Sequence, residues 1–168
     1  YGQIGIDNST TMGDNTGEMA VLPTDDLGTG HTAAASAPGR YHTCALLDNA
    51  SVKCWGRNNY GQLGINNGTQ MGDDSGEMAQ LTSINLGTGR TATAIEAGAY
   101  YTCALLDNSP VKCWGINHKG QLGIGNSTTM GDDTGEMAVL PSVNLGTGRT
   151  ATAIDAVLFF FLAFLDLS

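Results

Sequence analysis

Residues 100–115 read YYTCALLDNSPVKCWG, two runs of apolar and β-prone residues on either side of a cluster of Asp, Asn, Ser and Pro. Because such clusters reverse the chain, the two runs are predicted to pair as an antiparallel β-hairpin. If the reversal centres on Asn108, Cys103 lies opposite Cys113. Side chains alternate along a strand, so this pair occupies one face of the hairpin and Trp114 the other.

The same hairpin sequence stands earlier in the chain, as YHTCALLDNASVKCWG at residues 41–56. The offset between Trp55 and Trp114 is 59 residues. It also holds for a set of methionines, Met12, Met71 and Met130. A repeat of this length, with short strands and regular glycines, indicates stacked units that bury their apolar faces only against their neighbours.

Each copy is predicted to hold four short strands. Besides the hairpin, residues 91–97 alternate small and β-branched residues, which suits a strand between close neighbours. Residues 137–145 form a short extended segment that Pro141 would confine to a sheet edge. Four strands match the blade of a propeller, so we predict an all-β fold, a partial β-propeller. The copies are residues 2–60, 61–119 and 120–156.

A second motif follows each hairpin directly. It reads W-G-x-N-x-x-G-Q-L-G and stands at residues 55–64 and 114–123. Together with the C-A-L-L-D-N hairpin, it resembles the regulator of chromosome condensation (RCC) repeat family over residues 1–156. The resemblance implies a seven-bladed β-propeller. About three copies are present, which is not enough for closure.

The tryptophans and turn glycines of this motif are predicted to be structural. These residues are Trp55, Trp114, Gly61, Gly64, Gly120 and Gly123. The tryptophans could instead bind a ligand, but their fixed place in a strand favours packing between blades.

The third copy departs from the repeat after Ala156, where Val157 replaces the expected glycine. Residues 157–168 form an apolar tail, interpreted either as a sequence artefact or as a cover for the last blade. Its apolar run is about half the ~20 residues that span a bilayer, so no membrane contact is predicted. Because Tyr1 opens in mid-motif, we expect further sequence upstream.

The four cysteines fall into two Cys-x9-Cys pairs, one in each hairpin. Of the three possible pairings, the hairpin geometry favours Cys44 with Cys54 and Cys103 with Cys113. Disulfides would indicate an oxidising compartment. Two alternatives are buried thiols that pack as small apolar groups and a zinc site, which the absence of Cys-x2-Cys spacing disfavours.

Glycosylation sequons begin at Asn8, Asn67 and Asn126, the same repeat position, and at Asn49. Loops rich in Asn, Ser and Thr also produce this pattern by composition alone. With the paired cysteines, the sequons favour a secreted or extracellular location, with a cytoplasmic one as the alternative.

The chain is acidic, with 16 Asp and Glu against seven Lys and Arg and a net charge of -9. Such a charge opposes binding to phosphate backbones, so nucleic acid is not an expected partner. Each copy has an acidic loop, such as residues 131–136, but the spacing lacks the full ligand set of a calcium loop. We therefore expect solvated loops, no metal and no cofactor. Three histidines, His31, His42 and His118, recur in no other copy and are expected at the surface or in packing.

No serine or threonine stands in a nucleophile motif, and no glycine-rich stretch carries a phosphate-binding lysine. We predict a non-enzymatic module that binds an unidentified protein partner; a fold alone names no ligand. The resemblance implies an alternative, a guanine-nucleotide exchange factor for a small GTPase. Because about three blades leave apolar faces and strand edges open, we expect the isolated chain to self-associate.

Overall fold

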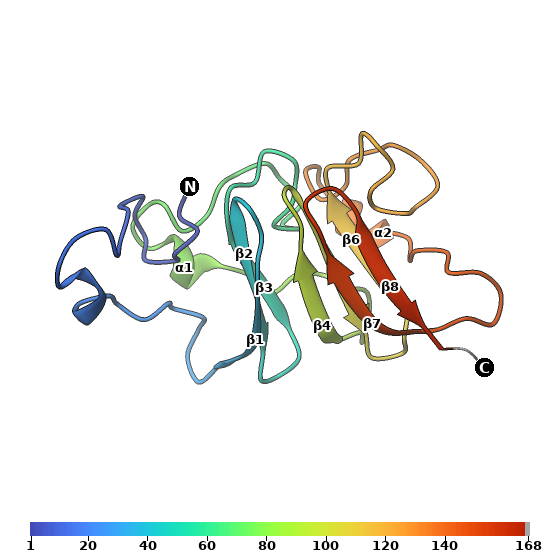
Figure 1. The fold of residues 1–168 in the computed structure, drawn as a ribbon, viewed down its shortest axis with the longest axis horizontal. Coiled ribbons are helices and arrows are strands. Elements are labelled where there is room, and N and C mark those ends of the chain that lie inside the picture. Colours follow the sequence, from blue (N-terminus) through green and yellow to red (C-terminus); the bar gives the residue numbers. More distant parts are fainter. Residues whose placement is uncertain (167–168) are drawn as a thin grey trace.

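The computed structural model describes residues 1–166 and contains three antiparallel sheets that lie side by side (Figure 1). The first sheet has β1 (Ala33–Pro38), β2 (His42–Leu47) and β3 (Val52–Gly56). The second has β4 (Ala92–Ala97), β5 (Tyr101–Leu106) and β6 (Val111–Gly115). The third has β7 (Ala151–Ala156) and β8 (Phe161–Leu165). The chain is thus all-β and forms a partial propeller, an open row of blades.

The predicted hairpins are confirmed in both three-stranded sheets. Cys103 lies opposite Cys113 in the β5–β6 pair, and Cys44 lies opposite Cys54 in the β2–β3 pair. The chain reverses where the Ser109 N–H donates a 2.9 Å hydrogen bond to the Leu106 carbonyl. Asp, Asn, Ser and Pro in the turn therefore set the register that brings the cysteines together.

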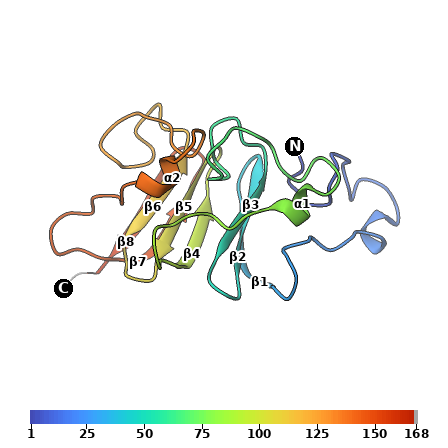
Figure 2. The same ribbon diagram turned by 180° about the vertical axis from the view of Figure 1, so that it is seen from behind.

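The predicted fourth strand is wrong. Residues 137–145 begin in a one-turn helix, α2 (Glu136–Val139), and its equivalents are α1 (Glu77–Gln80) and η1 (Glu18–Ala20). Within the described residues, the second sheet extends beyond β6 by one isolated bridge, between Gly115 and Met130. Seen from behind, α1 lies beside β3 and α2 beside β6 (Figure 2).

The acidic loops explain why this segment turns instead of extending. The Glu136 Oε2 atom accepts hydrogen bonds from the backbone N–H groups of Gly131, Asp132 and Asp133 at 2.7 to 3.1 Å. The Met137 N–H is bound by Asn66 Oδ1 of the preceding copy at 3.0 Å, as a cap to α2. These contacts satisfy the N–H groups at the start of the segment. Further along, the Val143 N–H donates a 2.8 Å hydrogen bond to the Val111 carbonyl of β6, a single contact and not a strand pairing.

The core lies between the sheets, where β4 packs against β1 and β2, and β7 packs against β4 and β5. Trp114 is fully buried, and its indole N–H donates a 3.1 Å hydrogen bond to the Gln62 carbonyl in the turn that follows the first sheet. A Cβ at Gly64 would lie 2.7 Å from this indole nitrogen, so only glycine allows the turn to approach the ring. Each turn thereby joins one blade to the next.

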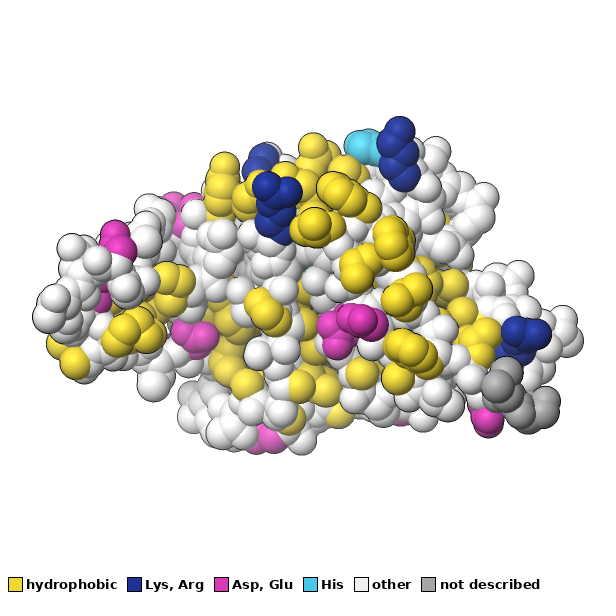
Figure 3. All heavy atoms as spheres, viewed as in Figure 1, with side chains coloured by type: hydrophobic (Ala, Val, Ile, Leu, Met, Phe, Trp, Pro, Cys, Tyr) yellow, Lys and Arg dark blue, Asp and Glu magenta, His cyan; other side chains and the backbone are white. Residues whose placement is uncertain are grey.

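The third sheet continues into the predicted apolar tail. Ala151 pairs with Leu165 just as Ala92 pairs with Leu106, so β8 takes the place of β5 in the repeat. The domain boundary predicted after residue 156 therefore falls at the β7–β8 turn, and residues 167–168 of the tail lie outside the described part. Hydrophobic side chains lie exposed over this sheet (Figure 3), among them Phe159, Phe160, Leu162 and Phe164.

Candidate interaction surface

Aromatic and cationic side chains gather at the end of the sheets where β1 turns into β2 and β4 turns into β5. We call this group the tyrosine–arginine surface. Its residues are Tyr1, Arg40, Tyr41, Arg57, Tyr60, Tyr100 and His118. Figure 3 shows hydrophobic side chains and Lys or Arg side chains together along the upper edge of the molecule, where these turns lie in Figure 1.

The repeat places the rings in register. Tyr41 and Tyr100 occupy the same position in consecutive copies, as do Tyr1 and Tyr60. Because equivalent positions lie at the same height in neighbouring blades, the Tyr41 and Tyr100 rings stack with centroids 5.0 Å apart. Tyr60 meets Tyr100 edge-on at 5.3 Å. The rings thus form a continuous row across adjacent blades.

Backbone hydrogen bonds hold the turns that carry this row. The Arg40 N–H donates a 3.2 Å hydrogen bond to the Gly98 carbonyl, which ties the β1–β2 turn to the β4–β5 turn. The Ala99 N–H likewise donates to the Leu158 carbonyl of the third sheet at 3.1 Å. The tyrosine–arginine surface is therefore built on linked turns, which lowers the entropy cost of presenting it to a partner.

The arginines lie over the rings. The Arg57 guanidinium carbon is 4.9 Å from the Tyr1 ring centroid and 5.4 Å from that of Tyr41, and Arg40 lies 5.1 Å from the Tyr41 centroid. These distances are typical of cation–π contacts. One N–H of Arg57 donates to Asn59 Oδ1 at 3.0 Å. Among residues 1–166, neither arginine forms a salt bridge.

An apolar depression adjoins this surface at the ends of β1, β4 and β7. Its volume is about 1040 Å³, and its lining includes Arg40, Gly98, Val157 and Phe160. Arg40 therefore belongs both to the depression and to the tyrosine–arginine surface.

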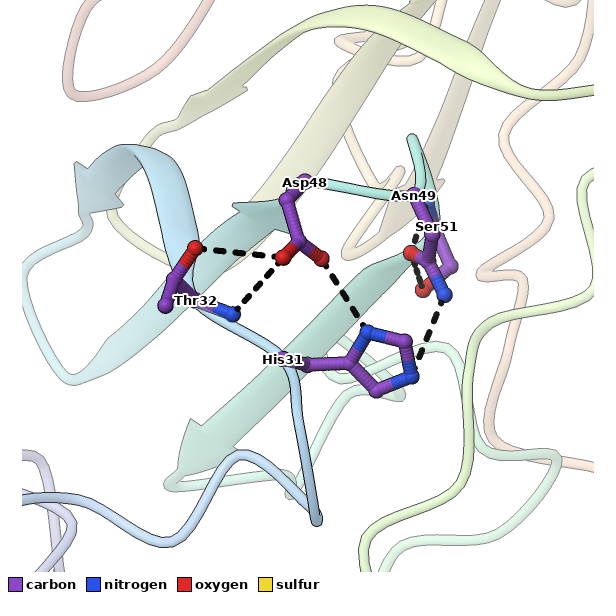
Figure 4. Close-up of polar contacts among 5 residues, drawn as sticks. All are labelled: His31, Thr32, Asp48, Asn49 and Ser51. Carbon is purple, nitrogen blue, oxygen red and sulfur yellow. Dashed lines mark hydrogen bonds and ion pairs between the residues drawn. The ribbon is translucent and has the colours of Figure 1, made fainter.

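His31 takes part in a polar cluster at the opposite end of the first sheet, beside the β2–β3 turn (Figure 4). Its Nδ1 lies 3.0 Å from Asp48 Oδ1, and Asp48 Oδ2 also accepts from the Thr32 N–H and hydroxyl. These contacts, led by His31, lower the pKa of Asp48. The Ser51 hydroxyl donates to Asn49 Oδ1 at 2.7 Å and does not reach the imidazole. This cluster links the β2–β3 turn to the segment that precedes β1. The Arg90–Asp107 pair makes the equivalent link in the next copy.

The acidic loops do not present a cation site. Glu18, Glu77 and Glu136 each turn a carboxylate oxygen onto backbone N–H groups of their own loop. Hydrogen bonds led by Asn15 lower the pKa of Glu18 to about 2. Within residues 1–166, no group of three or more His, Cys, Asp or Glu side chains is arranged to hold a metal ion.

The predicted disulfide and structural residues lie in the hairpins and in the turns that follow them. The structure joins Cys44 to Cys54 and Cys103 to Cys113, each with Cα atoms 4.1 Å apart. Trp55 and Trp114 are buried. The turn glycines Gly61, Gly64, Gly120 and Gly123 all have positive φ angles. The sequon asparagines Asn8, Asn49, Asn67 and Asn126 are exposed.

Sequence reasoning missed two features. The first is the tyrosine–arginine surface, for which the one indication in the sequence is the recurrence of tyrosines at the repeat spacing. The asparagine of the W-G-x-N motif also has a role: buried Asn58 donates to the Asn67 and Thr69 carbonyls and accepts from the Leu63 N–H. It therefore fixes the loop that carries one sequon.

Open antiparallel blades linked through their turns define a repeat protein of the propeller class. A family model for the regulator of chromosome condensation (RCC1) repeat matches residues 28–62 and 92–121. Over these two segments the chain matches the RCC1 repeat, so the predicted resemblance to this family is confirmed.

Two relatives show how little of a longer protein the chain spans. It is 28% identical to the dog X-linked retinitis pigmentosa GTPase regulator over 131 residues, 77% of this chain and 12% of that protein. It is 34% identical to the human probable E3 ubiquitin-protein ligase HERC4 over 88 residues, 52% of this chain and 8% of that protein. The chain thus spans about a tenth of each relative's length.

Solved structures support the fold. Human WBSCR16 aligns with a TM-score of 0.59 and 19% identity over 76% of this chain and 30% of its own. Saccharomyces cerevisiae Prp20p, whose structure was described with its binding to Gsp1p and histones, aligns with a TM-score of 0.59 and 16% identity over 82% of this chain and 32% of its own. None of the helices within residues 1–166 is long and apolar enough to cross a membrane.

Proposed function

We propose that this chain is a non-enzymatic module that binds a protein partner through the tyrosine–arginine surface. The observation that carries the proposal is the row of rings contributed by adjacent repeats, with Tyr41 and Tyr100 stacked at its centre. Tyrosine and arginine are enriched among the residues that dominate binding energy at protein interfaces.

The burial of these side chains supports the proposal. Tyr1 is 50% exposed, Arg40 is exposed, and Tyr41, Tyr60 and Tyr100 are half-buried. By contrast, Tyr101, the neighbour of Tyr100, is fully buried and donates its hydroxyl to the Val157 carbonyl at 2.7 Å. The row thus leaves part of each of these tyrosines accessible to a partner, whereas the adjacent Tyr101 belongs to the core.

A capture experiment with a matched control tests the proposal. The immobilised chain is compared with a Tyr41→Ser/Tyr100→Ser variant and with a His31→Ser variant at the opposite end. We expect a partner protein to be retained by the parent chain and by the His31 variant, and lost from the Tyr41/Tyr100 variant. Tryptophan fluorescence checks that each variant is folded. Equal retention by all three proteins would contradict the proposal.

Guanine-nucleotide exchange on a small GTPase is the second candidate, favoured by the relative named as a GTPase regulator. Addition of the chain to a GTPase loaded with a fluorescent guanine nucleotide distinguishes the two. We expect unchanged nucleotide release, and accelerated release would favour the exchange factor.

We also propose that the chain works in an oxidising compartment, either secreted or extracellular. The paired cysteines and the exposed sequon asparagines support this location. The exposed phenylalanines of the third sheet further support self-association of the isolated chain.

A further inference from the structure

We infer that the partner bound by the tyrosine–arginine surface is an acidic segment of another protein, with carboxylates that reach Arg57 and Arg40. This inference rests on the proposed function and specifies the chemistry of the partner.

Positive charge is scarce in this molecule, and three of the seven Lys and Arg residues lie at or beside this surface. The chain has seven Lys and Arg residues against 16 Asp and Glu. Arg40 and Arg57 lie over the tyrosine rings, and exposed Lys119 directly follows His118, which meets Tyr60 edge-on. A cationic site on an acidic protein discriminates between partners, because it attracts an acidic segment and repels a basic one.

The arginines are kept available for an outside carboxylate. Arg90 and His31 pair with aspartates of their own hairpins at 3.4 and 3.0 Å. Arg40 and Arg57 have no such partner within residues 1–166, although the chain is rich in acids. In the acidic loop of the second copy, Asp73 Oδ2 accepts a 3.1 Å hydrogen bond from the Gln70 side chain.

The rings also prepare the guanidinium group for binding. Arg57 lies within 6 Å of three ring centroids, at 4.9 Å for Tyr1, 5.4 Å for Tyr41 and 5.7 Å for Tyr100. Such contacts fix a long side chain that would otherwise lose rotamer freedom on binding. Within residues 1–166, Arg57 donates a side-chain hydrogen bond only through its Nε–H, to Asn59, which leaves its terminal nitrogens for a bidentate carboxylate contact.

The apolar depression beside Arg40 adds a second requirement. Val157 and Phe160 line it, so a segment that crosses the surface can place an apolar side chain there next to its carboxylates. The occupant is therefore an extended acidic segment with interspersed apolar or aromatic residues.

Fluorescence polarisation with short labelled peptides tests this inference on the full chain. The probe alternates Glu and Tyr, and the matched probes alternate Ser and Tyr or Lys and Tyr. We expect the acidic probe to bind at least about ten-fold more tightly than the neutral probe, as charge-assisted hydrogen bonds would give. The basic probe should bind most weakly, and added salt should weaken the acidic probe.

Variants locate the binding. Arg57→Ala and Arg40→Ala should each weaken the acidic probe by about ten-fold. Arg57→Lys keeps the charge but loses the planar fork, and should give an intermediate loss. Arg149→Ala removes an exposed positive charge outside this surface and is the matched control, with an expected change below about two-fold.

Two results would overturn the inference. One is equal affinity for the acidic and neutral probes, including no binding of either. The other is an equal loss in the Arg149 and Arg57 variants. If the partner protein is still lost from the Tyr41/Tyr100 variant in the capture experiment, the proposed function stands and only the acidic chemistry fails.

Discussion

Replacement of His42 by Phe should remove a large part of the acid sensitivity of this protein. His42 begins β2 and is fully buried. The Thr102 hydroxyl donates to the Gln62 carbonyl at 2.9 Å, so it accepts the 2.8 Å hydrogen bond from His42 Nε2. The proton of the neutral ring is therefore on Nε2. Protonation would add an N–H at Nδ1, which has no partner in the structure.

The magnitude follows from the pKa. Burial lowers the pKa of His42 from 6.5 to about 4. Between these values His42 is protonated in the unfolded chain and neutral in the folded chain. The free energy of unfolding therefore decreases as the pH falls from 6.5 to about 4. Each pH unit in this window costs about 1.4 kcal/mol, which amounts to about 3 kcal/mol in all.

Urea unfolding at a series of pH values, followed by the fluorescence of buried Trp55 and Trp114, measures this loss. Across this window the free energy of unfolding should fall in both proteins. We expect the decrease in His42→Phe to be about 3 kcal/mol smaller than the decrease in the parent chain. His118→Gln, at an exposed position, is the control and should follow the parent. An unchanged slope in His42→Phe, or a His42 imidazole that titrates near its ordinary pKa of 6.5 by NMR, would refute the reasoning.

Three other perturbations test the fold. Loss of the second disulfide, in Cys103→Ser/Cys113→Ser, should lower the free energy of unfolding by about 3 kcal/mol, since a short hairpin loop is released; peptide mapping without reductant that recovers Cys44 joined to Cys103 would contradict the pairing. Burial is the main cause that raises the pKa of Glu96, and the nearby Asp155 charge is the second. Ionisation of Glu96 at higher pH therefore destabilises the folded chain. Glu96→Gln should therefore raise Tm at neutral pH, and the gain should vanish well below pH 4.5, where both states are protonated; a gain that persists in acid would count against this cause. Sedimentation at micromolar concentration should show oligomers of the isolated chain that Phe159→Ser/Phe164→Ser reduces; a compact monomer of the parent chain would contradict self-association.

The fold could be predicted from sequence where the pattern is local. Alternation and turn residues placed Cys103 opposite Cys113, and the repeat spacing predicted blades linked through their neighbours. The short helices were missed because they depend on a side chain that reaches back to backbone donors, as Glu136 does. The strand β8 was not predicted, because its run of apolar residues shows no alternation of apolar and polar positions. Its pairing with β7 makes it a strand.

The interaction surface could not be predicted for a different reason. Tyr41 and Tyr100 are far apart in sequence and meet only when two blades pack together. The recurrence of tyrosine at the repeat spacing was visible, but the contact between the two turns, which includes the Arg40–Gly98 hydrogen bond, was not. His42, which breaks the repeat, was expected at the surface or in packing and proved to be buried.

Site-specific photocrosslinking tests most directly whether the tyrosine–arginine surface binds a protein partner. A photoreactive phenylalanine replaces Tyr60 in one protein and exposed Asn49, at the opposite end of the first sheet, in another. Both proteins are irradiated with extracts of the source organism. We expect a crosslinked partner at position 60 and none at position 49. Crosslinks to the same partner only at position 49, or none at position 60, would contradict the proposed binding surface.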